Sequence, residues 1–262
     1  MLSTKPPLII AHRGASIAAP ENTLAAFGQA LDTGADGLEL DVRLASDGVP
    51  VVIHDATLRR TGLVREAVAQ MSSAQLAKAD VGSWFNRTQP AMAREEYARQ
   101  FVPTLESVFQ LVIDRKPDDF TIYIELKTEE KSLDLAGPVA DVIKRYRFQE
   151  CVVIVSFDLD ALRQTKLIDS TFRTGALFAP RHGGGAGLRA ERILAMAVES
   201  GADEILLHRL IARTKLVSSA MRRDLKVVVW TVDDVKWLGR ARELGLHALI
   251  TNDPALLLSH RG

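Results

Sequence analysis

The stretch LIIAHRGASIAAPENTLAAF (8–27), followed by GADGLELDVRLASDGVPVVIHD (34–55), decides the fold and locates the chemistry of this chain. Its short apolar runs end in residues that can do chemistry: His12, Glu39, Asp41 and His54. Apolar runs with β-branched members predict buried strands, and polar side chains at the carboxyl ends of such strands are typical of barrel active sites. A charged side chain is costly to bury unless it is paired or binds a metal. The stretch therefore predicts an active site.

Eight apolar runs along the chain have the length and composition of buried strands. They cover residues 8–13, 37–42, 121–127, 151–157, 173–179, 204–209, 226–232 and 247–253. Helical spacing of apolar residues lies between most of them, for example in residues 21–35, 103–115 and 234–245. Strands that alternate with helices pair in parallel through crossover connections. Eight such units in 262 residues have the size of a (β/α)8 barrel, or TIM barrel.

Polar and aromatic residues at the ends of these runs favour the closed barrel over a doubly wound open sheet. The end residues are His12, Glu39, Asp41, Glu125, Lys127, Ser156, Phe178, His208 and Trp230. In a closed barrel the carboxyl ends of all strands meet at one mouth, so residues distant in sequence become neighbours. An open sheet does not need such residues at nearly every strand end. We predict one barrel domain over residues 1–262.

Two segments interrupt the alternation of strands and helices. Residues 42–54 have the pattern of a hairpin attached to the second strand, and Asp47-Gly48 is a good turn signal. Residues 56–103 have no strand pattern and a weak helical one, so we predict an insertion after strand two that is functional or caps the mouth. Within this insertion, Trp84 and Phe85 are expected to form a small local core with partial contact to the pocket.

The composition is that of an ordinary globular protein, with 47% hydrophobic and 25% charged residues. Lys+Arg and Asp+Glu both number 33, so no net charge attracts nucleic acid or an anionic membrane, and we expect no nucleic-acid partner. No run approaches the roughly 18 apolar residues of a membrane span. The single Cys151 excludes an internal disulfide and is expected to be a small buried residue. We expect a cytoplasmic protein without stable membrane insertion, and a homodimer stays open.

Three carboxylates at adjacent strand ends, Glu39, Asp41 and Glu125, predict a metal site. Glu39 and Asp41 are two residues apart and therefore face the same side of a strand. Like charges side by side favour a cation between them, and ligands that are all oxygen select Mg²⁺ or Ca²⁺ rather than zinc. The alternative is a network of ion pairs with nearby cations, namely Arg13, Arg43 and Lys127. We favour the metal, because strand-end carboxylates in barrels are usually catalytic.

His12 and His54 both follow apolar runs and precede a charged residue. Imidazole has the pKa that suits proton transfer near neutral pH. Two histidines beside a carboxylate cluster therefore suggest a base and an acid. A metal ion together with Arg13 and Lys127 would supply the positive charge that phosphate chemistry needs. The residues by themselves predict metal-assisted cleavage of a phosphate ester in a barrel.

The motifs of the chain closely resemble those of the glycerophosphodiester phosphodiesterase family. The specific opening motifs are HRGAS (12–16), PENT (20–23), ELDV (39–42) and DGVPVVIHDATLRRTG (47–62). The later motifs PTLES, IELK, SF, VWTV and LITNDP follow in the family's order. The resemblance therefore covers nearly the whole chain, from Ile10 to Pro254.

This resemblance implies a barrel with a small insertion after strand two and assigns roles to individual residues. It implies that His12 and His54 are the general acid and base, and that Glu39, Asp41 and Glu125 bind one divalent ion, Mg²⁺ or Ca²⁺. It also implies phosphate contacts for Arg13 and Lys127. We expect Trp230 either to pack against the glycerol or alcohol group of the substrate or to fill the barrel top, and His208 either to face the mouth and bind substrate or to be a hydrogen-bonded core histidine. The implied reaction is hydrolysis of a small glycerophosphodiester to glycerol 3-phosphate and an alcohol. The sequence leaves open which histidine is the acid, whether a cyclic phosphate forms, and which alcohol leaves.

One position departs from the family pattern. After VWTV the family commonly has Asn, and this chain has Asp233. Because Asp is a good N-cap residue, we expect Asp233 to cap the following helix rather than to change the charge of the pocket.

Three other functions stay open at the level of sequence. A lysophospholipase D-type enzyme would cleave lysophospholipids with the same residues. A barrel with a metal and a lysine could instead stabilise an enolate, as a lyase or racemase does, but the paired His-Arg and His-Asp motifs argue against it. A non-catalytic phosphodiester-binding barrel is the third alternative, since a fold alone does not establish activity.

Overall fold

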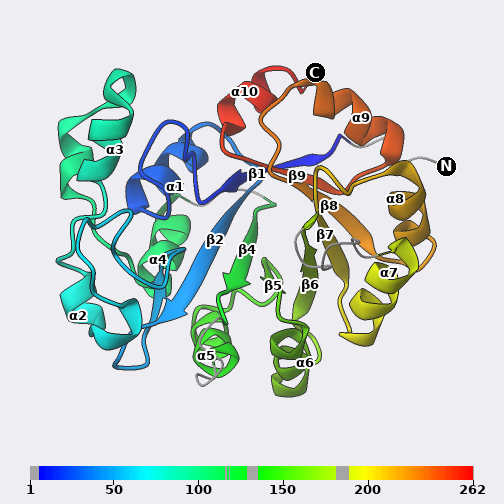
Figure 1. The fold of residues 1–262 in the computed structure, drawn as a ribbon, viewed down its shortest axis with the longest axis horizontal. Coiled ribbons are helices and arrows are strands. Elements are labelled where there is room, and N and C mark those ends of the chain that lie inside the picture. The colour runs from blue at the N-terminus through cyan, green and yellow to red at the C-terminus, as the bar shows by residue number, and fades with distance from the viewer. Residues whose placement is uncertain (1–5, 116, 118, 129–134, 181–188, 262) are drawn as a thin grey trace.

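The structure is a computed structural model that describes residues 6–115, 117, 119–128, 135–180 and 189–261 (Figure 1). Among these residues, no helix is long and apolar enough to cross a membrane.

Eight parallel strands close into a barrel. They are β1 (Leu8–His12), β2 (Gly37–Leu44), β4 (Thr121–Leu126), β5 (Val152–Ser156), β6 (Arg173–Phe178), β7 (Glu204–His208), β8 (Lys226–Trp230) and β9 (Ala248–Thr251). Each strand pairs in parallel with the next, and β9 pairs with β1 to complete the ring. The predicted (β/α)8 barrel is confirmed, and the doubly wound open sheet is excluded because the sheet has no open edge between β1 and β9.

Helices surround the barrel, as Figure 1 shows. The longer ones are α1 (Leu24–Asp32), α4 (Leu105–Arg115), α5 (Ala136–Tyr146), α6 (Leu159–Ile168), α7 (Ala190–Glu199), α8 (Thr214–Met221), α9 (Lys236–Leu244) and α10 (Pro254–Ser259). Because helices cover the outer face and side chains fill the interior, the strands are buried on both faces. This double burial explains why the strands are continuous apolar runs in the sequence rather than alternating ones.

The core has an outer and an inner layer. The outer layer packs strands against helices, and one of its clusters contains Leu38 and Ile122 together with Phe109 of α4. The inner layer fills the barrel with residues such as Tyr123 and Val153. Cys151 does not belong to the core: it is exposed, contrary to the sequence expectation, because it lies just before β5 begins.

The predicted hairpin on the second strand is present. Strand β3 (Pro50–Val52) pairs antiparallel with the end of β2. The turn contains Asp47-Gly48, and Gly48 has a φ of +77°, which only glycine adopts without strain. The hairpin leads the chain back toward the mouth, so that the N–H of Ile53 donates to the carbonyl oxygen of Asp41 at 2.9 Å.

The insertion consists of short helical pieces. They are η1 (Val68–Gln70), α2 (Ser73–Leu76), α3 (Ser83–Thr88), η2 (Pro90–Met92) and η3 (Glu95–Arg99). Phe85 and Tyr97 are buried together, with ring centroids 5.6 Å apart, and the half-buried Trp84 packs edge to face on Phe85 at 5.9 Å. This cluster includes Ala26 of α1, so the expected local core exists, but neither Trp84 nor Phe85 lines the cavity at the mouth of the barrel. Figure 1 shows α2 and α3 beside α1 and α4, at the side of the barrel.

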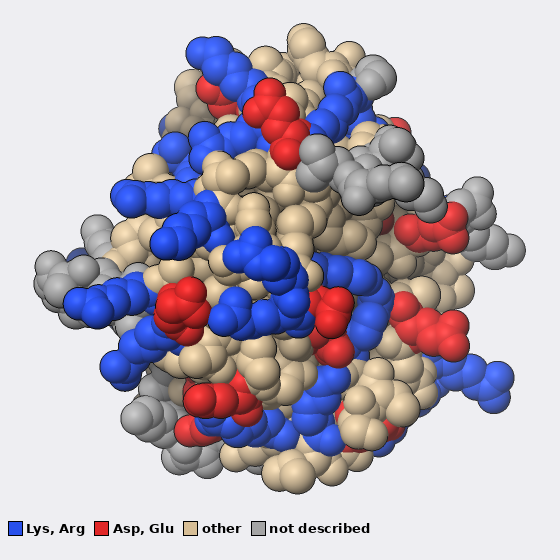
Figure 2. All heavy atoms as spheres, turned by 90° about the vertical axis from the view of Figure 1, so that its right-hand side faces the viewer, with Lys and Arg blue, Asp and Glu red and all other residues tan. Residues whose placement is uncertain are grey.

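The surface carries a mixture of both charges. Figure 2 shows the side formed by α7, α8 and α9, where many Lys and Arg side chains are interspersed with Asp and Glu. Local pairs occur there, such as Arg223 with Glu191 at 3.0 Å. Such exposed pairs contribute little to stability.

Candidate active site

The carboxyl ends of β1, β2 and β4 place the predicted site residues next to one another. Strand register sets His12 beside Glu39 and Asp41 beside Glu125. Lys127 directly follows β4. Alternate residues of a strand face the same side, so Glu39 and Asp41 both lie toward the barrel axis at its mouth.

A cavity of about 110 Å³ opens at this mouth. Its polar lining consists of His12, Arg13, Glu39, His54, Glu125 and Lys127. Its apolar lining consists of Val155, Phe157, Leu177, Leu206, Trp230 and Ile250. The cavity can therefore receive a small molecule that has a charged part and a less polar part.

The three carboxylates form a compact cluster. One oxygen each from Glu39, Asp41 and Glu125 lies within 4.8 Å of the other two, and all three residues are buried. Burial raises the pKa of Glu39 well above its usual range, and the neighbouring carboxylates raise it further. Burial also raises the pKa of Glu125 to about 7, although Lys127 opposes this shift. Such crowding of acids is what a bound divalent cation relieves, so the donor set fits Mg²⁺ or Ca²⁺.

Two cations share the same carboxylates. Arg13 Nε lies 3.1 Å from Asp41 Oδ2, and Lys127 Nζ lies 3.0 Å from Asp41 Oδ1 and 2.6 Å from Glu125 Oε1. Burial favours the neutral form of Asp41, but Arg13 and Lys127 hold its pKa well below the usual range. Part of the ion-pair network that the sequence offered as an alternative is therefore present. Arg43 donates from Nε to the carbonyl oxygen of His54 at 2.8 Å.

His12 is held by a residue from the other end of the chain. Its Nδ1 lies 2.7 Å from Asn252 Oδ1, and its Nε2 lies 3.8 Å from Glu39 Oε2. Burial and the nearby Arg13 lower the pKa of His12 to about 4. The imidazole is therefore neutral at pH 7.

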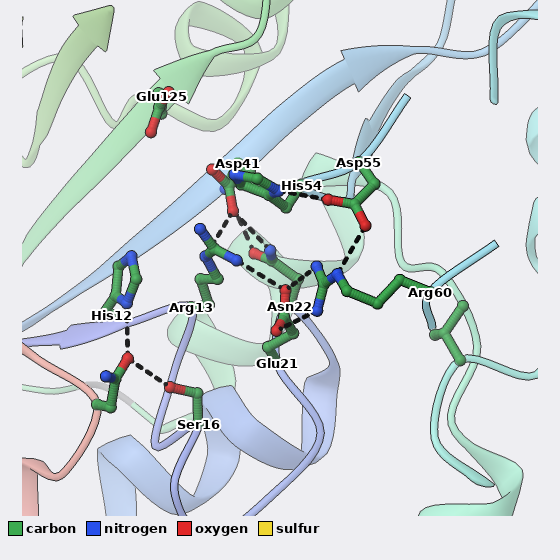
Figure 3. Close-up of polar contacts among 12 residues, drawn as sticks. His12, Arg13, Ser16, Glu21, Asn22, Asp41, His54, Asp55, Arg60 and Glu125 are labelled. Atoms are coloured by element: carbon green, nitrogen blue, oxygen red, sulfur yellow. Dashed lines mark hydrogen bonds and ion pairs between the residues drawn. The ribbon is translucent and has the colours of Figure 1, made fainter. Parts of the chain in front are cut away.

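His54 belongs to a chain of charged contacts at the rim (Figure 3). Its Nδ1 lies 2.6 Å from Asp55 Oδ1, and Asp55 Oδ2 accepts a hydrogen bond from Arg60 Nε at 2.7 Å. Burial lowers the pKa of His54, while Asp41 and the hydrogen bond to Asp55 oppose this shift. In both histidines Nδ1 is bonded to the protein, which leaves Nε2 for a ligand.

Comparison with known proteins shows the family of this chain. The model of the glycerophosphoryl diester phosphodiesterase family matches residues 12–256. The chain belongs to this family.

Individual relatives are similar to this chain over nearly its full length. A glycerophosphodiester phosphodiesterase from Caldanaerobacter subterraneus subsp. tengcongensis is 34% identical over 260 residues, which are 96% of each chain. Among solved structures, a phosphodiesterase from Oleispira antarctica, in complex with the product sn-glycerol-3-phosphate, is 26% identical with a TM-score of 0.83. That alignment covers 97% of this chain and 96% of the other. A glycerophosphodiester phosphodiesterase from Agrobacterium tumefaciens is 27% identical with a TM-score of 0.77 and coverage of 97% and 99%.

Two residues of the PENT motif (20–23), Glu21 and Asn22, have roles in the site that the sequence did not predict. Glu21 accepts hydrogen bonds from Arg13 at 2.9 Å and from Arg60 at 2.7 and 2.8 Å. Asn22 is buried and donates from Nδ2 to Asp41 Oδ2 at 2.8 Å. These two side chains orient Arg13 and Asp41, as Figure 3 shows. Their position in a family motif was the only feature of the sequence that indicated a role for Glu21 and Asn22, because the residues they contact lie elsewhere in the sequence.

The aromatic residues form a wall of the site. Trp230 lines the cavity, and its ring packs edge to face against Phe157 at 5.7 Å and His208 at 5.2 Å. His208 lies behind Trp230: its Nδ1 accepts the N–H of Leu210 at 3.3 Å. Phe157, which the sequence gave only as part of a motif, lines the cavity directly.

Asp233 does not cap the helix that follows it. Helix α9 begins at Lys236, whose N–H donates to Asp234 Oδ1 at 2.9 Å. Asp233 instead accepts hydrogen bonds from Asn252, the residue that holds His12. The expectation of a cap is wrong because the end of β9 lies beside this loop and offers the acid more donors than α9 does.

Proposed function

We propose that this phosphodiesterase hydrolyses glycerophosphodiesters to glycerol 3-phosphate and an alcohol, with one divalent cation, Mg²⁺ or Ca²⁺, in its site. The observation that carries the proposal is the meeting of three buried carboxylates, two imidazoles and two basic side chains around one cavity of about 110 Å³. The solved Oleispira antarctica relative, which holds sn-glycerol-3-phosphate, supports a product of this kind.

The carboxylates Glu39, Asp41 and Glu125 would hold the cation. A divalent ion in such a site neutralises charge on the phosphate oxygens and makes the phosphorus easier to attack. Arg13 and Lys127 line the cavity and would bind phosphate oxygens, because guanidinium and ammonium groups form strong, charge-assisted hydrogen bonds to them.

His12 and His54 would share the proton transfers. One Nε2 takes a proton from the attacking oxygen, which belongs to water or to a substrate hydroxyl. The bond between phosphorus and the leaving oxygen breaks, and the other Nε2 donates a proton to that oxygen. Attack by a substrate hydroxyl gives a cyclic phosphate, which water then opens in a second step.

The aromatic wall would receive the uncharged part of the substrate. Trp230 and Phe157 offer flat apolar surface for the glycerol or the alcohol. His208 would support Trp230 from behind, at a centroid distance of 5.2 Å. Residues 56–103 lie beside the barrel rather than over its mouth, and we propose that they act through Arg60, which contacts Glu21 and Asp55 at the rim.

Release of glycerol 3-phosphate from glycerophosphocholine tests the proposal. We expect release that stops with EDTA and returns with Mg²⁺ or Ca²⁺. His12→Ala and His54→Ala should each lower kcat at least about a hundredfold, the usual contribution of general acid–base catalysis. His260→Ala is the matched control, because His260 is exposed at the end of α10, and it should keep full activity.

Folded protein that releases no glycerol 3-phosphate with either metal would overturn the proposal. Cleavage of lysophospholipids by the same sample would then support the lysophospholipase D-type reaction, and no cleavage at all would support a binding protein.

The cellular setting belongs to the proposal as well. We propose a cytoplasmic enzyme that acts on small molecules, since a single cysteine suits a reducing compartment. Cell fractionation and sedimentation would test the location and the homodimer.

A further inference from the structure

The side chain of Asp233 joins the end of β8 to the end of β9. Its Oδ1 accepts the N–H of Asn252 at 2.8 Å and the hydroxyl of Thr251 at 3.0 Å. Its Oδ2 accepts Nδ2 of Asn252 at 2.8 Å. The acid thus holds both the backbone and the side chain of Asn252.

These contacts determine which way the amide of Asn252 points. An ionised carboxylate can only accept hydrogen bonds, so the NH₂ group of Asn252 must face Asp233. The amide oxygen therefore faces His12, at 2.7 Å from Nδ1, and also accepts the hydroxyl of Ser16 at 3.1 Å.

The orientation of the amide in turn selects the tautomer of His12. An amide oxygen has no proton to donate, so Nδ1 of His12 must carry one. In the neutral ring Nε2 is then an acceptor. This is the nitrogen that lies on the side of Glu39, at 3.8 Å, in the wall of the cavity.

We propose that Asp233 is a positioning residue, which acts through Asn252 to fix the ring of His12 and to keep its Nε2 free to accept a proton. The consequence for catalysis rests on the proposed function, whereas the tautomer does not. Partners of this kind commonly set the tautomer and orientation of a histidine in an active site.

Asp233→Asn is the decisive variant, because it changes one oxygen into an NH₂ group and keeps the shape. The introduced amide would keep its oxygen toward the N–H of Asn252 and direct its NH₂ group at the side chain of that residue. The amide of Asn252 would then turn, present NH₂ to His12, and move the proton of the ring to Nε2. We expect a ten- to hundredfold lower kcat, the usual cost of losing such a partner, with KM within about twofold because no group that contacts substrate is lost.

Two further variants separate positioning from simple loss of structure. Asp234→Asn changes the neighbouring acid, which contacts Lys236 of α9, and should leave kcat unchanged. The exchange Asp233→Asn with Asn252→Asp restores an acceptor toward His12 and a donor between the two loops. The kcat of this double variant should be at least about tenfold higher than that of Asp233→Asn alone.

A spectroscopic measurement tests the tautomer without turnover. ¹⁵N NMR of histidine-labelled, metal-free protein at pH 8 distinguishes protonated from unprotonated ring nitrogens, and the spectrum of His12→Gln assigns the signals. We expect Nδ1–H in the wild type and a shift toward Nε2–H in Asp233→Asn. Wild-type kcat in that variant, or a lower kcat with the Nδ1–H tautomer retained, would overturn the proposal. Because the NMR result does not depend on turnover, it stands apart from any failure of the proposed function.

Discussion

At the scale of single residues, this site holds more acid than its own cations neutralise. Arg13 and Lys127 contact Asp41, and Lys127 also contacts Glu125. Glu39 receives the backbone N–H of Arg13 at 3.0 Å. Burial raises the pKa values of Glu39 and Glu125, and that of Glu125 reaches about 7, so a cation that binds here near neutral pH competes with a proton on Glu125.

This competition predicts how the metal affinity depends on pH. Since the pKa of Glu125 is about 7, binding of Mg²⁺ or Ca²⁺ should release protons below pH 7, and the affinity should rise as the pH is raised from 6 to 8. Glu125→Gln should weaken binding at least about tenfold, because even the loss of a residue that only supports a metal ligand usually costs that much. Calorimetric titration in buffers of different ionisation enthalpy measures both the affinity and the protons released. An affinity that does not change with pH would contradict this expectation.

At the scale of elements, backbone geometry explains where the elements turn and end. The β2–β3 hairpin turns at Gly48, which has a φ of +77°. Helix α9 contains Gly239, and a Cβ atom introduced at this position by substitution would have no other atom within 4 Å. The two glycines therefore differ in conformation rather than in available space, because Gly48 also has nothing within 4 Å.

Alanine at these two glycines should have opposite effects. Gly48→Ala places a Cβ in the left-handed region and should lower the free energy of unfolding by about 1 kcal/mol. Gly239→Ala should raise it by roughly 0.5–1 kcal/mol, because alanine is the better helix former. Urea unfolding at 25 °C measures both changes. Equal effects of the two substitutions would show that backbone conformation does not decide the difference.

At the scale of the whole molecule, closure of the barrel brings distant residues together at its mouth and at its opposite end. At the mouth, His12 meets Asn252, 240 residues further along the chain. At the opposite end, His247 directly precedes β9, where its N–H donates to the carbonyl oxygen of Val227 in β8 and its carbonyl oxygen accepts the N–H of Leu8 in β1. Burial there, together with Lys226 and Arg173, lowers the pKa of His247 to about 4.

The half-buried His247 predicts a loss of stability in weak acid. In the unfolded chain this residue binds a proton when the pH falls below its ordinary pKa of 6.5. In the folded protein it binds the proton only when the pH falls to about 4. The contribution of the neutral imidazole to the free energy of unfolding is therefore fully present above pH 6.5. It is lost as the pH falls from 6.5 to 4. His247→Asn should reduce the difference in unfolding free energy between pH 7 and pH 5, measured by urea unfolding. An unchanged difference would mean that the folded protein accepts this proton as readily as the unfolded chain.

The strands and the hairpin could be predicted from the sequence because their signals are local. Buried parallel strands need apolar residues on both faces, so Ile9–Ile10 or Val153–Ile154 identify themselves without knowledge of their neighbours. Asp47-Gly48 marks its turn in the same way. The identities of the candidate site residues were visible too, since His12 or Glu39 at the end of an apolar run has no role in a core.

The contacts between loops could not be predicted, because nothing in the local sequence specifies a partner far along the chain. Asp233 has the composition of a helix cap, yet Asn252 and Thr251 offered it three hydrogen bonds once β8 and β9 lay side by side. Cys151 has an apolar run after it, but the start of β5 leaves it in solvent. The sequence by itself thus determined the barrel, its family and the residues at its mouth, through local burial and spacing. Only the tertiary structure decided how those residues are oriented, because orientation depends on donors and acceptors that the closed barrel brings together.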